Sequence, residues 1–167
     1  MLHFGIRPPF SSEGFLRRCS EFAPGEDQKV LNSLPQAQDY SRPKKFMPVI
    51  QGWVDFDTSL RNELAKIRAS RKHIDPAPYL RHDGFTSSAI AHIALAVHRN
   101  PSIVEAERSL DEARWQALDE LTVGHYFDLD FLIIYAYKLI ILERWEKIRA
   151  GDKEALLNET LARINGG

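Results

Sequence analysis

The sequence predicts an all-α protein, a compact bundle of about seven mostly antiparallel helices with one long packed loop over residues 36–55. Three observations lead to this fold class. Apolar residues recur at helical spacing along most of the chain, helix-start signals precede several of these stretches, and strands do not alternate with helices as in a parallel α/β fold. The 167 residues form either one helical domain, 1–167, or two lobes, 1–84 and 85–167.

The first helix is predicted over residues 12–22. Ser11 can cap it, and Phe10, which precedes the cap, can pack on Phe15 as a hydrophobic staple. Pro24-Gly25 ends this helix, and Glu26-Asp27 begins a short second helix that Pro35 stops.

Residues 36–55 show no sustained period and contain Pro43 and Pro48 among large apolar side chains. Prolines break helices while apolar side chains require burial, so we expect a long loop packed against the core. A third helix follows over residues 58–72, because Leu60, Leu64 and Ile67 recur at helical spacing.

Two further helices have recognisable start signals. Thr86 is the expected cap of a helix that ends near His98, with Phe85 in the position to contact Ile90. Asn100-Pro101 predicts a cap and a first-turn proline for the next helix, which continues to about residue 122.

The stretch GHYFDLD, residues 124–130, allows two interpretations. In the first, Asp128 caps the apolar helix over residues 129–150, and Phe127 packs on Leu132 as a staple. In the second, His125, Asp128 and Asp130 bind a metal together with Asp119 or Glu120. The cap is favoured because the same arrangement occurs before two other helices. Gly151-Asp152 is then expected to end this helix and begin the last one.

No motif indicates catalysis, so we predict no catalytic, cofactor-binding or metal-binding residues. The phosphate-binding, dinucleotide-binding and serine-nucleophile motifs are absent from the sequence. The single cysteine, Cys19, is interpreted as a packed residue rather than a nucleophile. The acidic pairs on the helix over residues 101–122, Asp111-Glu112 among them, are interpreted as a water-facing surface.

Charge is divided unevenly between two segments. Residues 42–82 carry nine Lys and Arg against four Asp and Glu, or +5, and residues 101–130 carry two against eight, or −6. Either the two segments pair with each other, or they offer separate surfaces to separate partners. The basic face formed by Arg61, Arg68, Arg71 and Lys72 is the predicted partner contact. It has too few aromatic neighbours to indicate nucleic-acid binding.

The longest apolar run, residues 131–142, contains Lys138 and is shorter than the roughly 20 residues of a membrane span. The first ten residues also lack the basic-then-apolar pattern of a secretory signal. We therefore expect a cytoplasmic protein. One cysteine rules out an intramolecular disulfide and is compatible with a reducing compartment.

Three segments resemble an uncharacterised bacterial family encoded with subunits of V-type ATPases: PPFSSEGFLRRCSEFAPGEDQKVL, LRNELAKIRASR and YFDLDFLIIYAYKLIILERWEKI. That family is distantly similar to the central-stalk C subunit, called d in eukaryotes. Asn62 and Arg68 resemble an Asn-and-Arg helix pattern of that subunit, which has three repeated helical lobes and is much longer than this chain.

The resemblance implies a non-catalytic helical subunit or assembly factor, an adaptor between rotor shaft and membrane ring. Its partners would be other V-type ATPase subunits, with peripheral membrane association through the complex and with no cofactor. Two alternatives remain from the residues themselves. One is a metal-dependent hydrolase with an acidic and histidine site near residues 119–130, and the other is a stand-alone regulatory scaffold.

Overall fold

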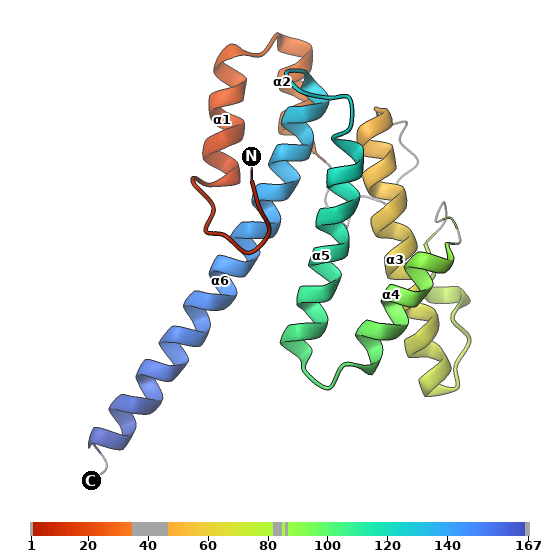
Figure 1. The fold of residues 1–167 in the computed structure, drawn as a ribbon, viewed down its shortest axis with the longest axis vertical. Coiled ribbons are helices and arrows are strands. Elements are labelled where there is room, and N and C mark those ends of the chain that lie inside the picture. Colours follow the sequence, from red (N-terminus) through yellow and green to blue (C-terminus); the bar gives the residue numbers. More distant parts are fainter. Residues whose placement is uncertain (1, 35–46, 82–84, 86, 166–167) are drawn as a thin grey trace.

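The computed structural model describes residues 2–34, 47–81, 85 and 87–165, with side chains up to residue 151. It is a compact all-helical bundle, and no strand occurs in these residues (Figure 1). The helices are α1 Ser12–Phe22, α2 Gly25–Asn32, α3 Pro48–Lys72, α4 Ser88–Arg99, α5 Ile103–Leu121 and α6 Leu129–Asn165, and a short 3-10 turn, η1, spans Ala77–Tyr79.

Helix α1 has the bounds and the start signals that its sequence predicts. The Ser11 Oγ accepts a hydrogen bond from the Gly14 amide at 3.0 Å, and the rings of Phe10 and Phe15 stack with their centroids 6.0 Å apart. Ser12 then joins α1 to α6, because its amide and its hydroxyl both donate to the Glu143 carboxylate, at 2.9 and 2.6 Å.

Helix α3 begins ten residues earlier than the sequence analysis predicts, so the predicted loop is wrong over residues 48–55. Pro48 lies in the first turn, where its missing N–H requires no partner, and it starts the helix instead of breaking it. Val49, Ile50, Trp53 and Val54 are buried on one side of this first part. Residues 36–46 of the predicted loop lie outside the described residues.

Gly52 allows α3 and α5 to approach each other closely. A Cβ built at Gly52 would lie 2.9 Å from the Leu121 Cδ2 of α5. A larger side chain at this position would therefore require Leu121 to move. The close approach places the next two turns of α3, including Asp57, against α5.

The caps of α4 and α5 differ from the predicted ones. Thr86 lies outside the described residues, the N-cap of α4 is Ser87, and Phe85 is exposed. The N-cap of α5 is Ser102, whose Oγ accepts from the Glu105 amide at 3.3 Å. Asn100 instead ends α4, and its Oδ1 accepts from the Ser102 amide at 2.9 Å. The helix thus begins after Pro101, because the serine can cap it directly.

Helix α6 is one helix where the sequence predicts two. Asp128 caps it as predicted, since its Oδ1 accepts from the Phe131 amide at 2.9 Å. Phe127 is fully exposed, so the predicted staple onto Leu132 does not form. Gly151 does not end the helix, because a glycine weakens a helix but retains the backbone N–H that continues it.

Two clusters of buried apolar residues form the core. The larger joins α1, α2, α3, α5 and α6 around residues such as Leu31, Trp53 and Leu139, and the smaller joins α3, α4 and α5 around Leu60 and Ala94. Both clusters include residues from either side of position 84. Among the described helices, none is long and apolar enough to cross a membrane.

Candidate functional site

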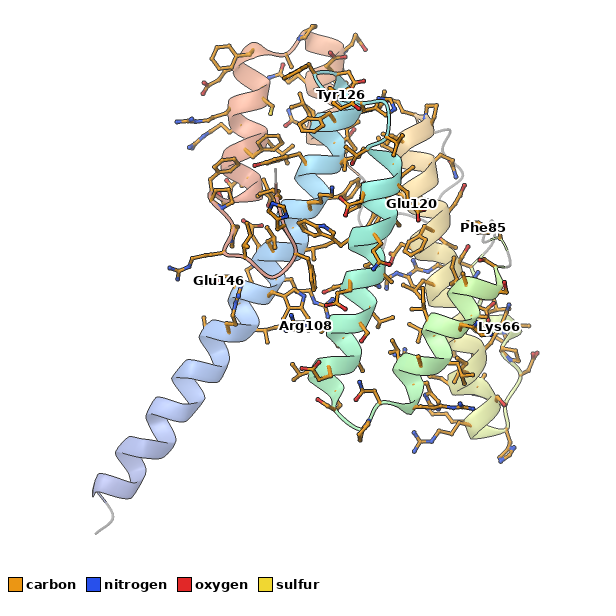
Figure 2. The ribbon with its side chains drawn as sticks, in the orientation of Figure 1. Lys66, Phe85, Arg108, Glu120, Tyr126 and Glu146 are labelled. Carbon is orange, nitrogen blue, oxygen red and sulfur yellow. The ribbon has the colours of Figure 1, made fainter. Side chains whose placement is uncertain are left out.

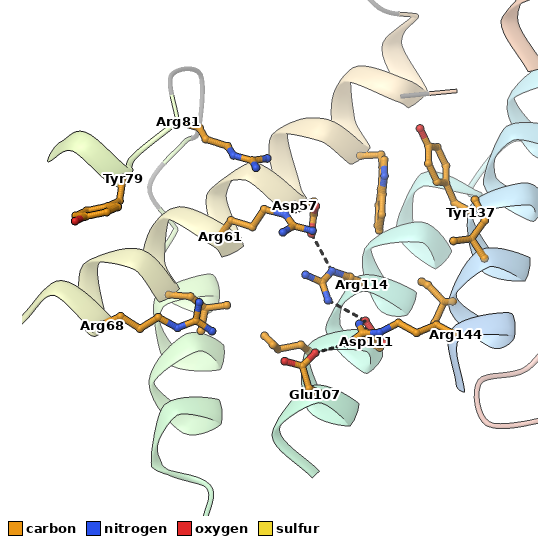
Figure 3. Close-up of a pocket in the computed structure, with 15 residues that line it drawn as sticks. Asp57, Arg61, Arg68, Tyr79, Arg81, Glu107, Asp111, Arg114, Tyr137 and Arg144 are labelled. Carbon is orange, nitrogen blue, oxygen red and sulfur yellow. Dashed lines mark hydrogen bonds and ion pairs between the residues drawn. The ribbon is translucent and has the colours of Figure 1, made fainter. Parts of the chain in front are cut away.

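A cleft of about 520 Å³ opens between α3, α5 and α6, next to the segment that follows η1 (Figure 3). Its charged lining consists of five arginines and three acids: Arg61, Arg68, Arg81, Arg114, Arg144, Asp57, Glu107 and Asp111. Trp53, Tyr79 and Tyr137 add aromatic rings, and Leu64, Leu110, Ile140 and Ile141 supply apolar wall. The volume lies within the range of small-molecule sites, roughly 300–1,000 Å³.

Asp57 organises the α3 side of the cleft. Its side chain is 2% exposed, and it accepts from the Arg61 Nε at 2.7 Å and from the Arg114 Nε at 2.8 Å. Arg61 lies one turn further along α3, whereas Arg114 comes from α5. The guanidinium groups of Arg61 and Arg114 therefore converge on one buried carboxylate (Figure 3).

Asp111 organises the opposite side of the cleft. Arg114 Nη1 donates to its Oδ1 at 2.8 Å, and Arg144 Nη1, from α6, donates to its Oδ2 at 2.9 Å. The indole Nε1 of Trp145 also donates to Oδ2, at 3.0 Å, while Arg144 Nη2 donates to Glu107. One network of ion pairs thus connects three helices.

The network shifts the pKa values of its buried members. Burial alone would raise the pKa of Asp57, but the charges and hydrogen bonds of Arg114 and Arg61 outweigh it and hold that pKa below its usual value. Burial would likewise lower the pKa of Arg114, and Asp57 and Asp111 outweigh it and raise that pKa. Both residues are therefore charged at neutral pH.

Only part of the predicted basic face belongs to the cleft. Arg61 and Arg68 line it, whereas Arg71 and Lys72 are exposed in the last turn of α3 and are not among its lining residues. The positive charges of Arg71 and Lys72 there stabilise the negative end of the helix dipole. The structure thus divides the predicted contact into a cleft part and a helix-end part.

The interpretation of the acidic residues of α5 as water-facing is wrong for Asp111, which is 1% exposed. Sequence reasoning also missed Asp57 and Arg114 as a pair that joins helices. Their spacings to Arg61 and Asp111, four and three residues, are those of helical ion pairs, and this local signal is in the sequence. The contact between Asp57 and Arg114 spans 57 positions, and no local pattern in the sequence signals it.

The opposite net charges of residues 42–82 and 101–130 do not account for the buried ion pair that joins them. Asp57 is an acid within the basic segment and Arg114 a base within the acidic one, so this ion pair runs against the overall charges. The acidic segment is instead paired with α6. Lys138 is buried and contacts Asp119 at 2.5 Å, and Arg144 contacts Asp111 and Glu107.

His125, Asp128 and Asp130 do lie together at the start of α6. His125 Nδ1 is 2.6 Å from Asp128 Oδ2 and 3.6 Å from Asp130 Oδ2. The hydrogen bond that His125 donates to Asp128, with the charges of both carboxylates, raises the pKa of His125, and the same bond lowers the pKa of Asp128. Within the part of the chain whose side chains are described, no group of three His, Cys, Asp or Glu residues could hold a metal.

Cys19 lies on α1 in a second, mostly apolar cavity of about 800 Å³, between α1, the segment after it and the start of α6. The thiol is half-buried, and burial raises its pKa above the ordinary value. A raised pKa lowers the thiolate fraction at neutral pH, and the thiolate is the nucleophilic form.

Comparison with known proteins gives a family match for one region of the chain. Residues 91–167, from within α4 to the C-terminus, match the model of a family described as a protein of unknown function, DUF2764. No curated protein matches the chain. No solved structure matches it either. The chain is therefore similar to this family over α5, α6 and most of α4.

Proposed function

We propose that the protein is a non-catalytic helical subunit or assembly factor of a bacterial V-type ATPase, an adaptor between rotor shaft and membrane ring. Two things support the proposal. The first is the resemblance of three segments to a family encoded with V-type ATPase subunits. The second, which carries the structural argument, is the path of α6.

The first part of helix α6 packs in the bundle, and its last part, called the arm below, does not. Its first half contributes buried residues such as Ile133, Leu139 and Leu142 to the larger core cluster. The remainder leaves the bundle and extends away from the other helices (Figure 1). At about 1.5 Å per residue, its 37 residues span roughly 55 Å. A continuous helix anchored at one end in a packed core can hold a partner at a set distance.

Contacts with the N-terminal segment brace the point where α6 leaves the bundle. Glu146, labelled in Figure 2, lies at this point and accepts from Arg7 at 2.9 Å. Arg149, one turn further, donates to the backbone carbonyl of Gly5 at 3.2 Å. Such pairs at the surface contribute little stability, but they join this part of α6 to the N-terminal segment.

An exposed apolar patch lies at the other end of the molecule. Val123, Tyr126 and Phe127, in the turn between α5 and α6, and Phe22, at the end of α1, are all at least 70% exposed. Tyr126 marks this end in Figure 2. Exposed apolar side chains that gather at one place are typical of protein contacts. Two contact regions at opposite ends suit an adaptor.

The test is recovery of partners with a tagged copy from the native cell at low salt. We expect rotor-shaft or membrane-ring subunits of the ATPase to be recovered with the full chain. A tagged copy with Tyr126→Ser and Phe127→Ser is the matched variant, and we expect it to recover less. Repeated recovery of no ATPase subunit, together with normal ATPase assembly in a deletion strain, would contradict the proposal.

A further inference from the structure

We propose that the cleft between α3, α5 and α6 binds a small molecule through a phosphate group. This site goes beyond the adaptor function and is independent of it. The charges of the lining favour an anion, since even without Arg81 four arginines stand against three acids. Phosphate esters are anionic near neutral pH, which matches the sign of this surplus.

The hydrogen-bond donors of the cleft also exceed its acceptors. Arg61 donates to Asp57 through Nε, so its two Nη atoms have no acceptor among the described residues. Arg114 uses Nε and Nη1, which leaves Nη2. Arg68 has no hydrogen bond or ion pair with any residue that the structure describes. These remaining N–H groups would be satisfied by the oxygens of a phosphate.

The wall of the cleft also contains a buried donor group. Trp53 is 6% exposed and lines the cleft, and its indole Nε1 has no hydrogen-bond partner within the described part of the chain. The Nε1 atom is itself covered, so the donors that face the cleft are the guanidinium groups, while the acceptors of the cleft are already engaged.

Two of the donor side chains, Arg61 and Arg114, are held in place before any ligand arrives. Asp57 and Asp111, each about 2% exposed, fix Arg61 and Arg114 through short ion pairs. Asn62 clamps the backbone of Arg81, donating to its carbonyl at 2.9 Å and accepting from its amide at 2.8 Å. Because the side chains of Arg61 and Arg114 are ordered in advance, binding to them would lose less conformational entropy than binding to a mobile lysine cluster.

Phosphate is a better match than a single carboxylate for geometric reasons. A guanidinium donates two parallel N–H groups to a phosphate, and three phosphate oxygens can be shared among several arginines. A carboxylate has only two oxygens and one charge. Tyr79, which is largely exposed, lies on the α3 side of the cleft with Arg68 (Figure 3) and could contact an attached ring.

The experiment is calorimetric titration of the full chain, in a phosphate-free buffer at low salt, with pyrophosphate, ADP and adenosine. We expect pyrophosphate and ADP to bind and adenosine not to bind. ADP tighter than pyrophosphate would assign a nucleotide, and equal affinities would assign the phosphate group alone; both support the proposal.

The informative variant is Arg68→Gln, which removes a guanidinium that makes no hydrogen bond or ion pair with the described residues, so we expect the fold to be retained. We expect at least tenfold weaker binding of pyrophosphate. Arg71→Gln, an exposed arginine on the same helix outside the cleft, is the matched control and should bind as the wild type does.

Three outcomes would overturn the proposal. The first is no binding of either phosphate compound, and the second is equal weakening in Arg68→Gln and Arg71→Gln, which would indicate nonspecific charge attraction. The third is tight binding of an oligoglutamate peptide without binding of pyrophosphate, which would assign the cleft to an acidic protein segment. None of these results bears on recovery of ATPase subunits in the pull-down.

Discussion

The buried carboxylates of Asp57 and Asp111 connect helices that the chain brings together from distant positions. Each accepts from at least two donors, and together they engage Arg61, Arg114 and Arg144. A buried charge is tolerated only while its partners remain, because removal of one member leaves the others desolvated and uncompensated.

Asp57→Ala should therefore lower the free energy of unfolding by about 3–5 kcal/mol, the range for breaking a buried ion pair. The matched control is Asp55→Ala on the same helix, whose carboxylate accepts one hydrogen bond, from Gln51, within the described part of the chain. Loss of that bond should cost about 0.5–1.5 kcal/mol. Urea denaturation measures both, and equal losses in the two variants would contradict the central role of Asp57.

The lowered pKa of Asp57 determines how its contribution to stability changes with pH. Its folded value is depressed below the ordinary 3.8, so the stability that it contributes is present above that value and disappears as the pH falls through the folded pKa. The difference in the free energy of unfolding between the wild type and Asp57→Ala should therefore be at its full value at pH 7 and should decrease only in strong acid.

Asp128 should act as a helix cap and not as a metal ligand. Asp128→Ala removes the acceptor of the Phe131 amide, so we expect a lower melting temperature. Asp128→Asn and Asp128→Ser retain an acceptor oxygen and should melt close to the wild type. If both behave like the alanine variant, and divalent metal raises the melting temperature of the wild type, the metal interpretation is correct.

His125 should make stability depend on pH near neutrality. Its pKa is raised above the ordinary 6.5 by the hydrogen bond to Asp128, so its contribution is full below 6.5 and is lost as the pH rises through the folded pKa. We expect the wild type to be more stable relative to His125→Gln at pH 5.5 than at pH 8.5. A difference between the two proteins that does not change with pH would contradict the His125–Asp128 contact.

At the scale of single elements, α6 depends on helical continuity through Gly151. A helix that ended here would place this glycine in a left-handed conformation, as Gly124 is with φ +89°. Gly151 instead lies inside α6, and a Cβ built on it meets no atom within 4 Å.

Gly151→Ala should consequently stabilise the arm, by about 0.5–1 kcal/mol at this position. The measurement is amide hydrogen exchange, which should be slower for residues 148–155 in the variant. Exchange is the suitable method because a substitution in a helix outside the bundle affects local stability more than global stability. Gly124→Ala is the contrasting variant and should destabilise the protein. Faster exchange around position 151 in Gly151→Ala would indicate that the helix breaks there.

At the scale of the whole molecule, the end of α3 and the cleft are separable surfaces. Arg71→Glu combined with Lys72→Glu changes the charge of an exposed helix end and leaves the lining of the cleft intact. Exposed charges at the rim of an interface affect association rates more than final affinity. We expect this double variant to associate with the ATPase subunit recovered in the pull-down about tenfold more slowly at low salt.

The control is Arg17→Glu combined with Arg18→Glu, which makes the same change of charge at two exposed positions of α1. Surface plasmon resonance at two salt concentrations separates rate from affinity. If the two double variants slow association equally, the effect comes from net charge and not from the end of α3.

The helical class, the bounds of α1 and the caps Ser11 and Asp128 could be predicted from the sequence alone. Each depends on hydrogen bonds or ring contacts between residues three to five positions apart, so a short stretch contains the whole signal. Pro48 and Gly151 were misinterpreted for a related reason, because both residues are compatible with a helix as well as with its end.

The cleft and its ion pairs, in contrast, depend on the tertiary structure and could not be predicted from the sequence. Asp57 and Arg114 are 57 positions apart, and Asp111 and Arg144 are 33 apart, so no local pattern pairs them. Their burial follows from how closely α3, α5 and α6 pack, which Gly52 and the apolar faces permit. The same sequence with different helix contacts would leave Asp111 in water, because the sequence specifies the charges and the packing decides which of them meet.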